Sequence, residues 1–155
     1  MRVKLKDRLA EDLKNNLDYH LTTYKNSTGW LGRAWLTLNG IELVNFSNPD
    51  TWKYFKSYSN ELCETGYISH AAVKDEDRSN NAGMERGEFS KYNFSGSAFE
   101  FLTELNIEQS QKSTNPIHRM LAMLDKRTGK RRIFELREKE THPLVLKMIE
   151  LRIGK

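Results

Sequence analysis

The sequence contains a single cysteine, Cys63, so it cannot form an internal disulfide. A lone cysteine is typical of a reducing compartment, and we expect Cys63 to be a small buried apolar residue. The chain also lacks a run of about 18 apolar residues, and no apolar stretch follows the charges near Met1. These absences predict a soluble, cytoplasmic protein without a membrane contact.

The motifs that usually mark an active site are missing as well. The sequence has no His-Glu-x-x-His zinc motif and no Gly-x-Ser-x-Gly nucleophile motif. The Gly129-Lys130 pair does not belong to a phosphate-binding P-loop, because a leucine stands where the first glycine of that loop is needed. We therefore expect no catalytic residues, no metal and no cofactor.

The histidines offer one weaker alternative. None of them has a second histidine or cysteine at metal-ligand spacing. They are His20, His70, His118 and His142. His70 shortly precedes an acidic segment that contains Asp75, Asp77 and Glu88. An enzyme with a site around His70 and this acidic loop is therefore a hypothesis to keep, although a structural role is expected for each histidine.

Charge is distributed unevenly along the chain. The 155 residues carry a formal net charge of +4, and 30% of them are charged, which suits one domain with a small core and a charged surface. Residues 112–155 contain 12 basic and 5 acidic side chains, whereas residues 50–111 contain 6 and 11. Such asymmetry marks either an anionic partner or two surfaces of one domain that attract each other. We predict one domain over 1–155, in which a hairpin-containing body (1–111) and the basic helical segment (112–155) fold together.

The clearest predicted helix spans residues 4–25. Five leucines recur every four residues and Tyr24 continues the series, which places one apolar stripe along a helix. The leucines are Leu5, Leu9, Leu13, Leu17 and Leu21. The polar residues 26–29 are expected to end this helix.

Residues 30–46 predict a β-hairpin. Asn39-Gly40 separates two apolar, β-forming segments and suits a tight turn that requires positive φ at both central residues. A two-residue turn implies the cross-strand pairs Leu38–Ile41, Thr37–Glu42, Leu36–Leu43 and Trp35–Val44. Because both faces would then carry apolar groups, we expect the hairpin to be covered on both sides or extended by a further strand.

Helices are predicted for most of the remaining chain. We expect a helix over 49–64, a short strand over 67–73 (with a helix start as the alternative) and a polar loop over 74–88. A helix opened by residues 95–97 is expected to run through Leu105 and to bury its phenylalanines. Those are Phe99 and Phe101. Further helices are expected to begin at Asn106, at Asn115 (with Pro116 in first position), at Lys130 and near Thr141. Gly129 is expected to end the helix that Asn115 caps.

A dense basic cluster spans the end of the helix that Asn115 caps and the start of the next helix. Its five cations are Lys126, Arg127, Lys130, Arg131 and Arg132. Such a cluster can neutralise phosphates, so it is the candidate anion-binding and nucleic-acid-binding site. The alternative is a solvated surface on which nearby carboxylates pair with the cations. Cations at the start of a helix also oppose the helix macrodipole, which makes the cluster locally unfavourable.

Residues 115–132 read Asn-Pro-Ile-His-Arg-Met-Leu-Ala-Met-Leu-Asp-Lys-Arg-Thr-Gly-Lys-Arg-Arg and resemble a segment of a family of small bacterial proteins without an assigned function. That family is also similar in a hairpin like residues 32–40, a stretch like 85–90 and an ending like 142–145. The resemblance covers about half the chain and implies a bacterial origin and a shared fold, but no activity. Polar residues of the matching segment are expected to form salt bridges, with Asp125 pairing with Arg119 or Arg131.

The predicted fold is α+β and helix-rich, with a β-hairpin or small antiparallel sheet packed against helices and a helical C-terminal segment. Since no group of residues has catalytic spacing, the leading hypothesis is a non-enzymatic binding or accessory protein that acts through protein–protein contacts. Nucleic-acid binding through the basic cluster is the alternative. An enzyme around His70 is the third hypothesis.

Overall fold

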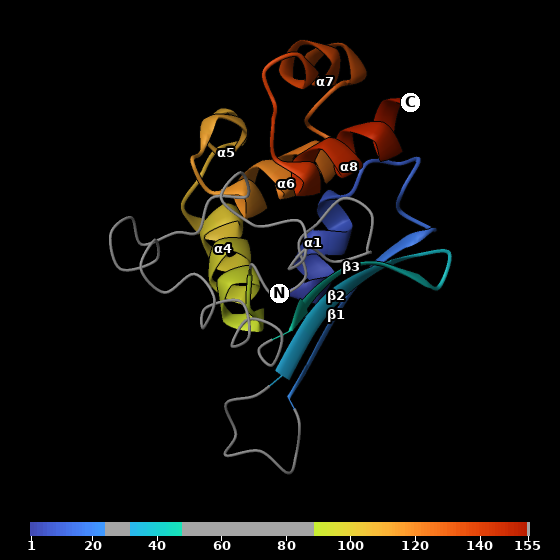
Figure 1. Ribbon diagram of the computed structural model, residues 1–155, viewed down its shortest axis with the longest axis vertical. Coiled ribbons are helices and arrows are strands. Elements are labelled where there is room, and N and C mark those ends of the chain that lie inside the picture. Colours follow the sequence, from blue (N-terminus) through green and yellow to red (C-terminus); the bar gives the residue numbers. More distant parts are fainter. Residues whose placement is uncertain (24–31, 48–88, 155) are drawn as a thin grey trace, which may run out of the picture.

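The computed structural model describes residues 1–23, 32–47 and 89–154, and it confirms the α+β fold. A three-stranded antiparallel sheet in the order β1-β2-β3 packs against helices, and further helices gather beyond one end of it (Figure 1). The described elements are α1 (Arg2–Arg8), β1 (Leu17–Thr23), β2 (Gly32–Leu38), β3 (Ile41–Ser47), α4 (Lys91–Thr103), α5 (Ile107–Lys112), α6 (Pro116–Leu124), α7 (Lys130–Arg137) and α8 (Pro143–Ile153).

The prediction of one long N-terminal helix over residues 4–25 is wrong. Helix α1 is only seven residues long, Leu9 then makes an isolated β-bridge with Asp125, and the chain continues as strand β1. The four-residue leucine spacing was ambiguous because it also fits the two-residue period of a strand, which places Leu17 and Leu21 on one face. This segment is a strand because β1 pairs with β2 along the whole length of β1.

The predicted hairpin is confirmed as β2 and β3. Its turn residues, Asn39 and Gly40, have φ angles of 52° and 79°, as the tight turn requires. Next to the turn the predicted pairs Leu38–Ile41 and Thr37–Glu42 are present. A bulge then shifts the register by one residue, so the observed pairs are Leu36–Val44 and Trp35–Asn45 instead of those expected. The hairpin is extended by a further strand, β1, whose residues were expected to be helical.

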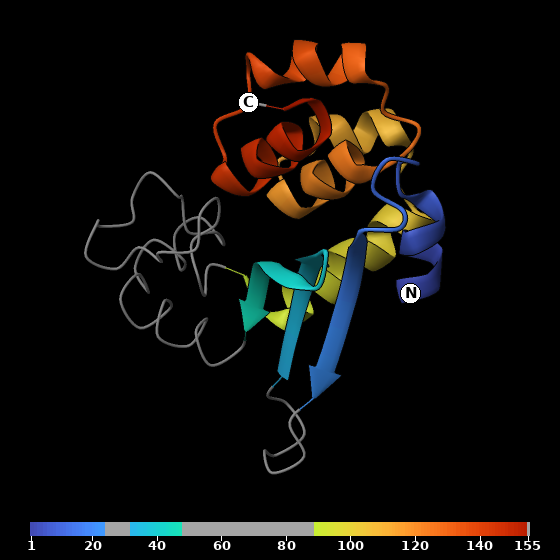
Figure 2. The ribbon, with the colours of Figure 1, turned by 90° about the vertical axis from the view of Figure 1, so that its right-hand side faces the viewer.

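Helix α4 packs against the inner face of the sheet, and Figure 2 shows it running behind the strands. Phe94 stacks on Tyr19 and Phe46, with ring centroids 6.3 and 5.0 Å apart. The expected Phe101 is buried with them, but Phe99 is 58% exposed. The inward stripe of α4 follows Phe94 at helical spacing, and Phe99 lies off that stripe.

Local capping chemistry sets the helix starts. Helix α4 begins four residues before the predicted start, because Ser90 and Asn93 form a reciprocal capping box. The predicted caps at Asn106 and Asn115 are confirmed, since each side chain accepts a hydrogen bond from a first-turn amide. Helix α6 ends at its C-cap Asp125 rather than at the predicted glycine, which instead precedes α7.

The buried apolar side chains form one cluster that draws on the sheet, α1, α4 and helices α6 to α8. The helix predicted over 49–64, the strand over 67–73 and the polar loop over 74–88 lie outside the described residues, as do Cys63 and His70. Across the described ranges, no helix has the length and apolarity that a bilayer crossing requires.

Candidate functional site

The basic cluster begins in the turn between α6 and α7, where a buried carboxylate organises the chain. Asp125 is 1% exposed and accepts hydrogen bonds from the backbone amide, Nε and Nη2 of Arg127 at 2.8, 2.9 and 2.7 Å. The hydrogen bond to Asp125 raises the pKa of the Arg127 guanidinium. The expected pairing of Asp125 with Arg119 or Arg131 is therefore wrong, because Arg127, two residues along the chain, occupies both carboxylate oxygens.

Two more cations connect this turn to the rest of the protein through hydrogen bonds to backbone carbonyls. Arg152 of α8 is buried and donates from Nη1 to the carbonyl of Met123 at 2.6 Å and from Nη2 to that of Thr128 at 3.3 Å. Burial lowers the pKa of this guanidinium. Lys126 donates from Nζ to the carbonyl of Asp7, at 3.0 Å. In this region cations mainly satisfy carbonyl groups that have no helical partner.

Only part of the predicted five-cation cluster is thus available to a partner. Arg132 also has internal contacts, to Gln111 Oε1 at 3.2 Å and Glu135 Oε2 at 3.1 Å. Arg131 is fully extended into solvent, 95% exposed at its side chain, and lies 3.5 Å from the Glu135 carboxylate. Lys130 is exposed, and within the described ranges no carboxylate lies within ion-pair distance of it.

The exposed side of α7 carries an aromatic residue that the sequence analysis did not single out. Phe134 is 53% exposed, whereas its neighbour Ile133 is fully buried. Lys130 and Arg137 lie four residues before and three residues after Phe134, so all three share one face of the helix. We call Lys130, Arg131, Phe134 and Arg137 the α7 surface. Figures 1 and 2 show α7 as the outermost element at this end of the molecule.

The start of α7 is electrostatically unfavourable. Its N-cap is Gly129, which provides no side-chain hydrogen bond, and its first turn contains three cations and no carboxylate. A helix N-terminus carries about half a positive charge, so each cation there costs a few tenths of a kcal/mol. No contact in the described part of the chain offsets this for Lys130, so the arrangement has no evident benefit to the fold.

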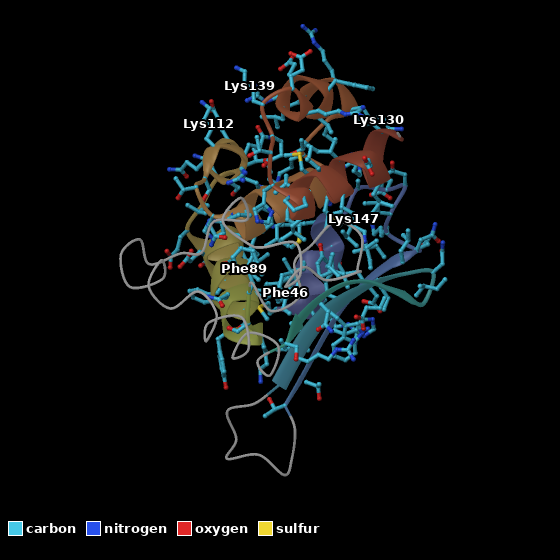
Figure 3. The ribbon with its side chains drawn as sticks, viewed as in Figure 1. Phe46, Phe89, Lys112, Lys130, Lys139 and Lys147 are labelled. Carbon is cyan, nitrogen blue, oxygen red and sulfur yellow. The ribbon has the colours of Figure 1, made fainter. Side chains whose placement is uncertain are left out.

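A groove adjoins the α7 surface. Two neighbouring cavities of about 760 and 420 Å³ share Lys112, Leu136 and Lys139 in their walls. The floor of the smaller cavity includes the apolar Met123 and Ile149. We call these two cavities together the α5–α7 groove. In Figure 3, Lys112 and Lys139 lie on the same side of this end of the molecule, and Lys130 lies on the other.

An ion pair builds one wall of the α5–α7 groove. Arg119 donates from Nε and Nη2 to the two carboxylate oxygens of Glu140, at 2.8 and 3.0 Å. Glu140 also accepts the amides of Thr141 and His142, which lead into α8. Burial raises the pKa of Glu140, but the hydrogen bonds from Arg119 and the two amides outweigh it, so the pKa is lowered.

The described histidines have structural contacts. His20 stacks on Trp35 and contacts Thr37 Oγ1 at 2.9 Å on the outer face of the sheet. His118 contacts Ser113 Oγ through Nδ1 at 3.0 Å, and the N-cap residue His142 accepts the amide of Leu144. In the described residues, no three His, Cys, Asp or Glu side chains are grouped to hold a metal ion.

Sequence reasoning missed the α5–α7 groove because its walls come from four helices whose packing is not local. The α7 surface did have a signal, the three-and-four spacing of Lys130, Phe134 and Arg137. Adjacent residues of a helix point about 100° apart, so Ile133 and Phe134 cannot both face the core directly, and the spacing indicated which of them shares a face with the cations.

Comparison with known proteins adds a family but no activity. No curated protein and no solved structure matches the chain. The model of the SF0329 protein family matches residues 1–153. The chain therefore belongs to the SF0329 protein family.

Proposed function

We propose that this chain is a non-enzymatic binding protein of the bacterial cytoplasm, which docks an acidic segment of a partner protein on the α7 surface. The observation that carries the proposal is the exposed Phe134 between Lys130 and Arg137, on a helix whose first turn holds Lys130 without a carboxylate at ion-pair distance in the described residues. Aromatic and arginine side chains supply a large share of binding energy at protein interfaces.

The electrostatics favour an acidic partner. A carboxylate placed near the start of α7 would interact with Lys130, with Arg131 and with the positive end of the helix macrodipole. The unfavourable arrangement in the free protein would thus become favourable in the complex. Charge complementarity of this kind also accelerates association and makes it sensitive to salt.

Nucleic-acid binding remains the second candidate, because Lys130 and Arg131 sit side by side at a helix start, a position that also suits phosphate groups. Against it, α7 carries carboxylates among its cations, at Glu135 and in its C-cap Glu138. Three of the five residues first assigned to the site, Lys126, Arg127 and Arg132, also have internal contacts. The hypothesis of an enzyme around His70 concerns residues outside the described ranges and stays a prediction.

Fluorescence anisotropy can separate the two candidates. The probes are a fluorescein-labelled acidic peptide of about 18 residues, with glutamates on one helical face and leucines on the other, and a labelled random-sequence DNA duplex. We expect the peptide to bind at low salt, with an affinity that falls as salt rises, and the duplex to bind at least about tenfold more weakly.

The variants Lys130→Glu and Arg137→Glu should weaken binding of the peptide. Lys4→Glu is the matched control, because Lys4 is an exposed cation on α1 that makes the same change in net charge. Preferential binding of the duplex would replace the proposal with nucleic-acid binding. No binding of either probe, or an equal loss with Lys4→Glu, would refute the assignment of the α7 surface.

A further inference from the structure

We infer that the α5–α7 groove receives the apolar side of an acidic amphipathic helix supplied by the partner protein. This inference rests on the proposed function and deepens it, because it names the conformation of the partner segment and the place of its apolar anchors. The α7 surface would then contact the acidic side of the same segment.

The size and lining of the α5–α7 groove fit aliphatic side chains. Its two cavities have volumes of about 760 and 420 Å³, which is the range of clefts that bind sizeable ligands. Phe134 and Leu136 contribute apolar wall to the larger cavity, and Leu136 also lines the smaller one beside the buried Met123 and Ile149. Burying one leucine in such a site is worth roughly one to two powers of ten in affinity.

The walls of the groove favour a helical occupant. They are formed by α5, α6, α7, α8 and the segments between these helices, and no strand of the described sheet borders the groove. A peptide that binds as an added β-strand needs an unpaired strand edge for its backbone hydrogen bonds, whereas a helix satisfies its own and binds through side chains alone. A helix-in-groove arrangement is therefore the mode that this geometry supports.

The charge of the rim favours an acidic occupant. The two cavities are lined by five cations and three carboxylates, so the lining is net positive. Lys139 has no carboxylate within ion-pair distance in the described ranges, and Lys112 pairs at 2.7 Å only with Glu108. That pair is exposed and spaced i,i+4, so it is weak and Lys112 can exchange Glu108 for a carboxylate of the partner.

The carboxylates beside these cations argue for a protein rather than a nucleic acid. Glu135 and Glu138 line the larger cavity together with Lys139 and Arg132. A phosphate backbone would be repelled by both glutamates, whereas an amphipathic helix can place its spaced glutamates beside the lysines and away from Glu135 and Glu138. The mixed charge thus selects a partner with spaced acidic residues.

The test compares three acidic peptides by anisotropy on the full chain. The first is the leucine-containing peptide, the second replaces its central leucines with alanine, and the third replaces one central residue with proline. We expect the alanine and proline peptides to bind at least about tenfold more weakly than the first. Circular dichroism should show the first peptide becoming helical when it binds.

Two protein variants locate the peptide. Thr114→Trp places a bulky ring at the exposed rim of the smaller cavity without touching the core, and it should weaken the leucine peptide about tenfold while leaving the alanine peptide unchanged. The double variant Lys112→Glu/Lys139→Glu should weaken binding of both the leucine peptide and the alanine peptide. The control for Thr114→Trp is Thr103→Trp, a substitution at an exposed position of α4.

The outcomes separate the two proposals. If all three peptides bind equally and Thr114→Trp has no effect, while Lys130→Glu still weakens them, the groove inference is refuted and the α7 surface stands. If the proline peptide binds as tightly as the first, the helical conformation is refuted. If no acidic peptide binds, both the groove inference and the proposed function are refuted.

Discussion

The ion pair between Arg119 and Glu140 allows a sharp test of how this end of the molecule is held together. Glu140 is 9% exposed at its side chain and accepts four hydrogen bonds, two from Arg119 and two from the amides of Thr141 and His142. The substitution Glu140→Gln keeps the shape and one accepting oxygen. It replaces the other oxygen with an amide NH₂ that faces the Nε–H of Arg119, so one donor faces another.

The magnitude follows from what Arg119 retains. Breaking a buried ion pair from one side typically costs about 3–5 kcal/mol, because the other charge is left uncompensated. Arg119 is 19% exposed at its side chain and still donates to the carbonyls of Ser113 and Thr114 at 2.7 and 3.0 Å, which reduces the cost. We therefore expect Glu140→Gln to lower the free energy of unfolding by about 2–4 kcal/mol at pH 7.

The effect should depend on pH in a definite direction. The pKa of Glu140 is lower in the folded protein than the ordinary value of 4.5, so the folded state favours the carboxylate. Such a group contributes stability that is fully present above the unfolded pKa and is lost as the pH falls through the folded pKa. The difference in stability between wild type and Glu140→Gln should consequently be complete at pH 7 and should shrink below about pH 4.5.

Urea unfolding followed by circular dichroism at several pH values measures both quantities. The control is Glu138→Gln, an exposed glutamate two residues away, for which we expect a change within about 0.5 kcal/mol. A loss below about 1 kcal/mol for Glu140→Gln, or a loss that is independent of pH down to pH 3, would contradict the role given to this ion pair.

Three further changes test the fold. Arg152→Met should cost about 2–4 kcal/mol in urea unfolding, because it strips the carbonyls of Met123 and Thr128 of their buried donor; an unchanged midpoint would contradict this. Gly32→Ala should lower the melting temperature, since its new Cβ would collide with the Thr22 carbonyl and the Lys91 side chain, and a rise would refute that packing. Gly40→Ala should cost about 1 kcal/mol because φ is +79° there, although a Cβ would meet no neighbour, and a neutral result would argue against the turn geometry.

The parts of the fold that sequence reasoning predicted well depend on local chemistry. The Asn39-Gly40 turn and the caps at Asn106 and Asn115 involve residues within three positions of each other, so their physical signal is contained in a short segment. The capping box at Ser90 was equally local and could have been recognised from Asn93 three residues later.

The predictions that proved wrong concern segments whose structure depends on contacts between residues far apart in the sequence. Leu9 ends up in a bridge with Asp125, and the amide of Ala10 donates to the carbonyl of Leu124, so the N-terminal leucine pattern is interrupted by the turn after α6. The bulge beside Leu36 likewise depends on which side chains of β3 meet the core. A stripe of leucines alone does not contain this information.

The candidate site also has a part that the sequence predicted and a part that only the folded structure shows. The cations were visible in the sequence, but their availability was not, because Asp125, Gln111 and a backbone carbonyl engage three of them only after folding. Phe134 and the α5–α7 groove emerge from the packing of α7 on α8. Composition therefore predicted a basic surface, whereas the structure selects which cations can meet a partner.

The most direct test is an NMR titration of the ¹⁵N-labelled chain with the leucine-containing acidic peptide. Amide shift changes should concentrate on α7 and on the residues around Lys112 and Thr114, and should weaken together as salt is raised. Shift changes that instead cluster on α1 or the outer face of the sheet around Trp35, or that are absent at millimolar peptide, would contradict the assignment of this surface to an acidic partner.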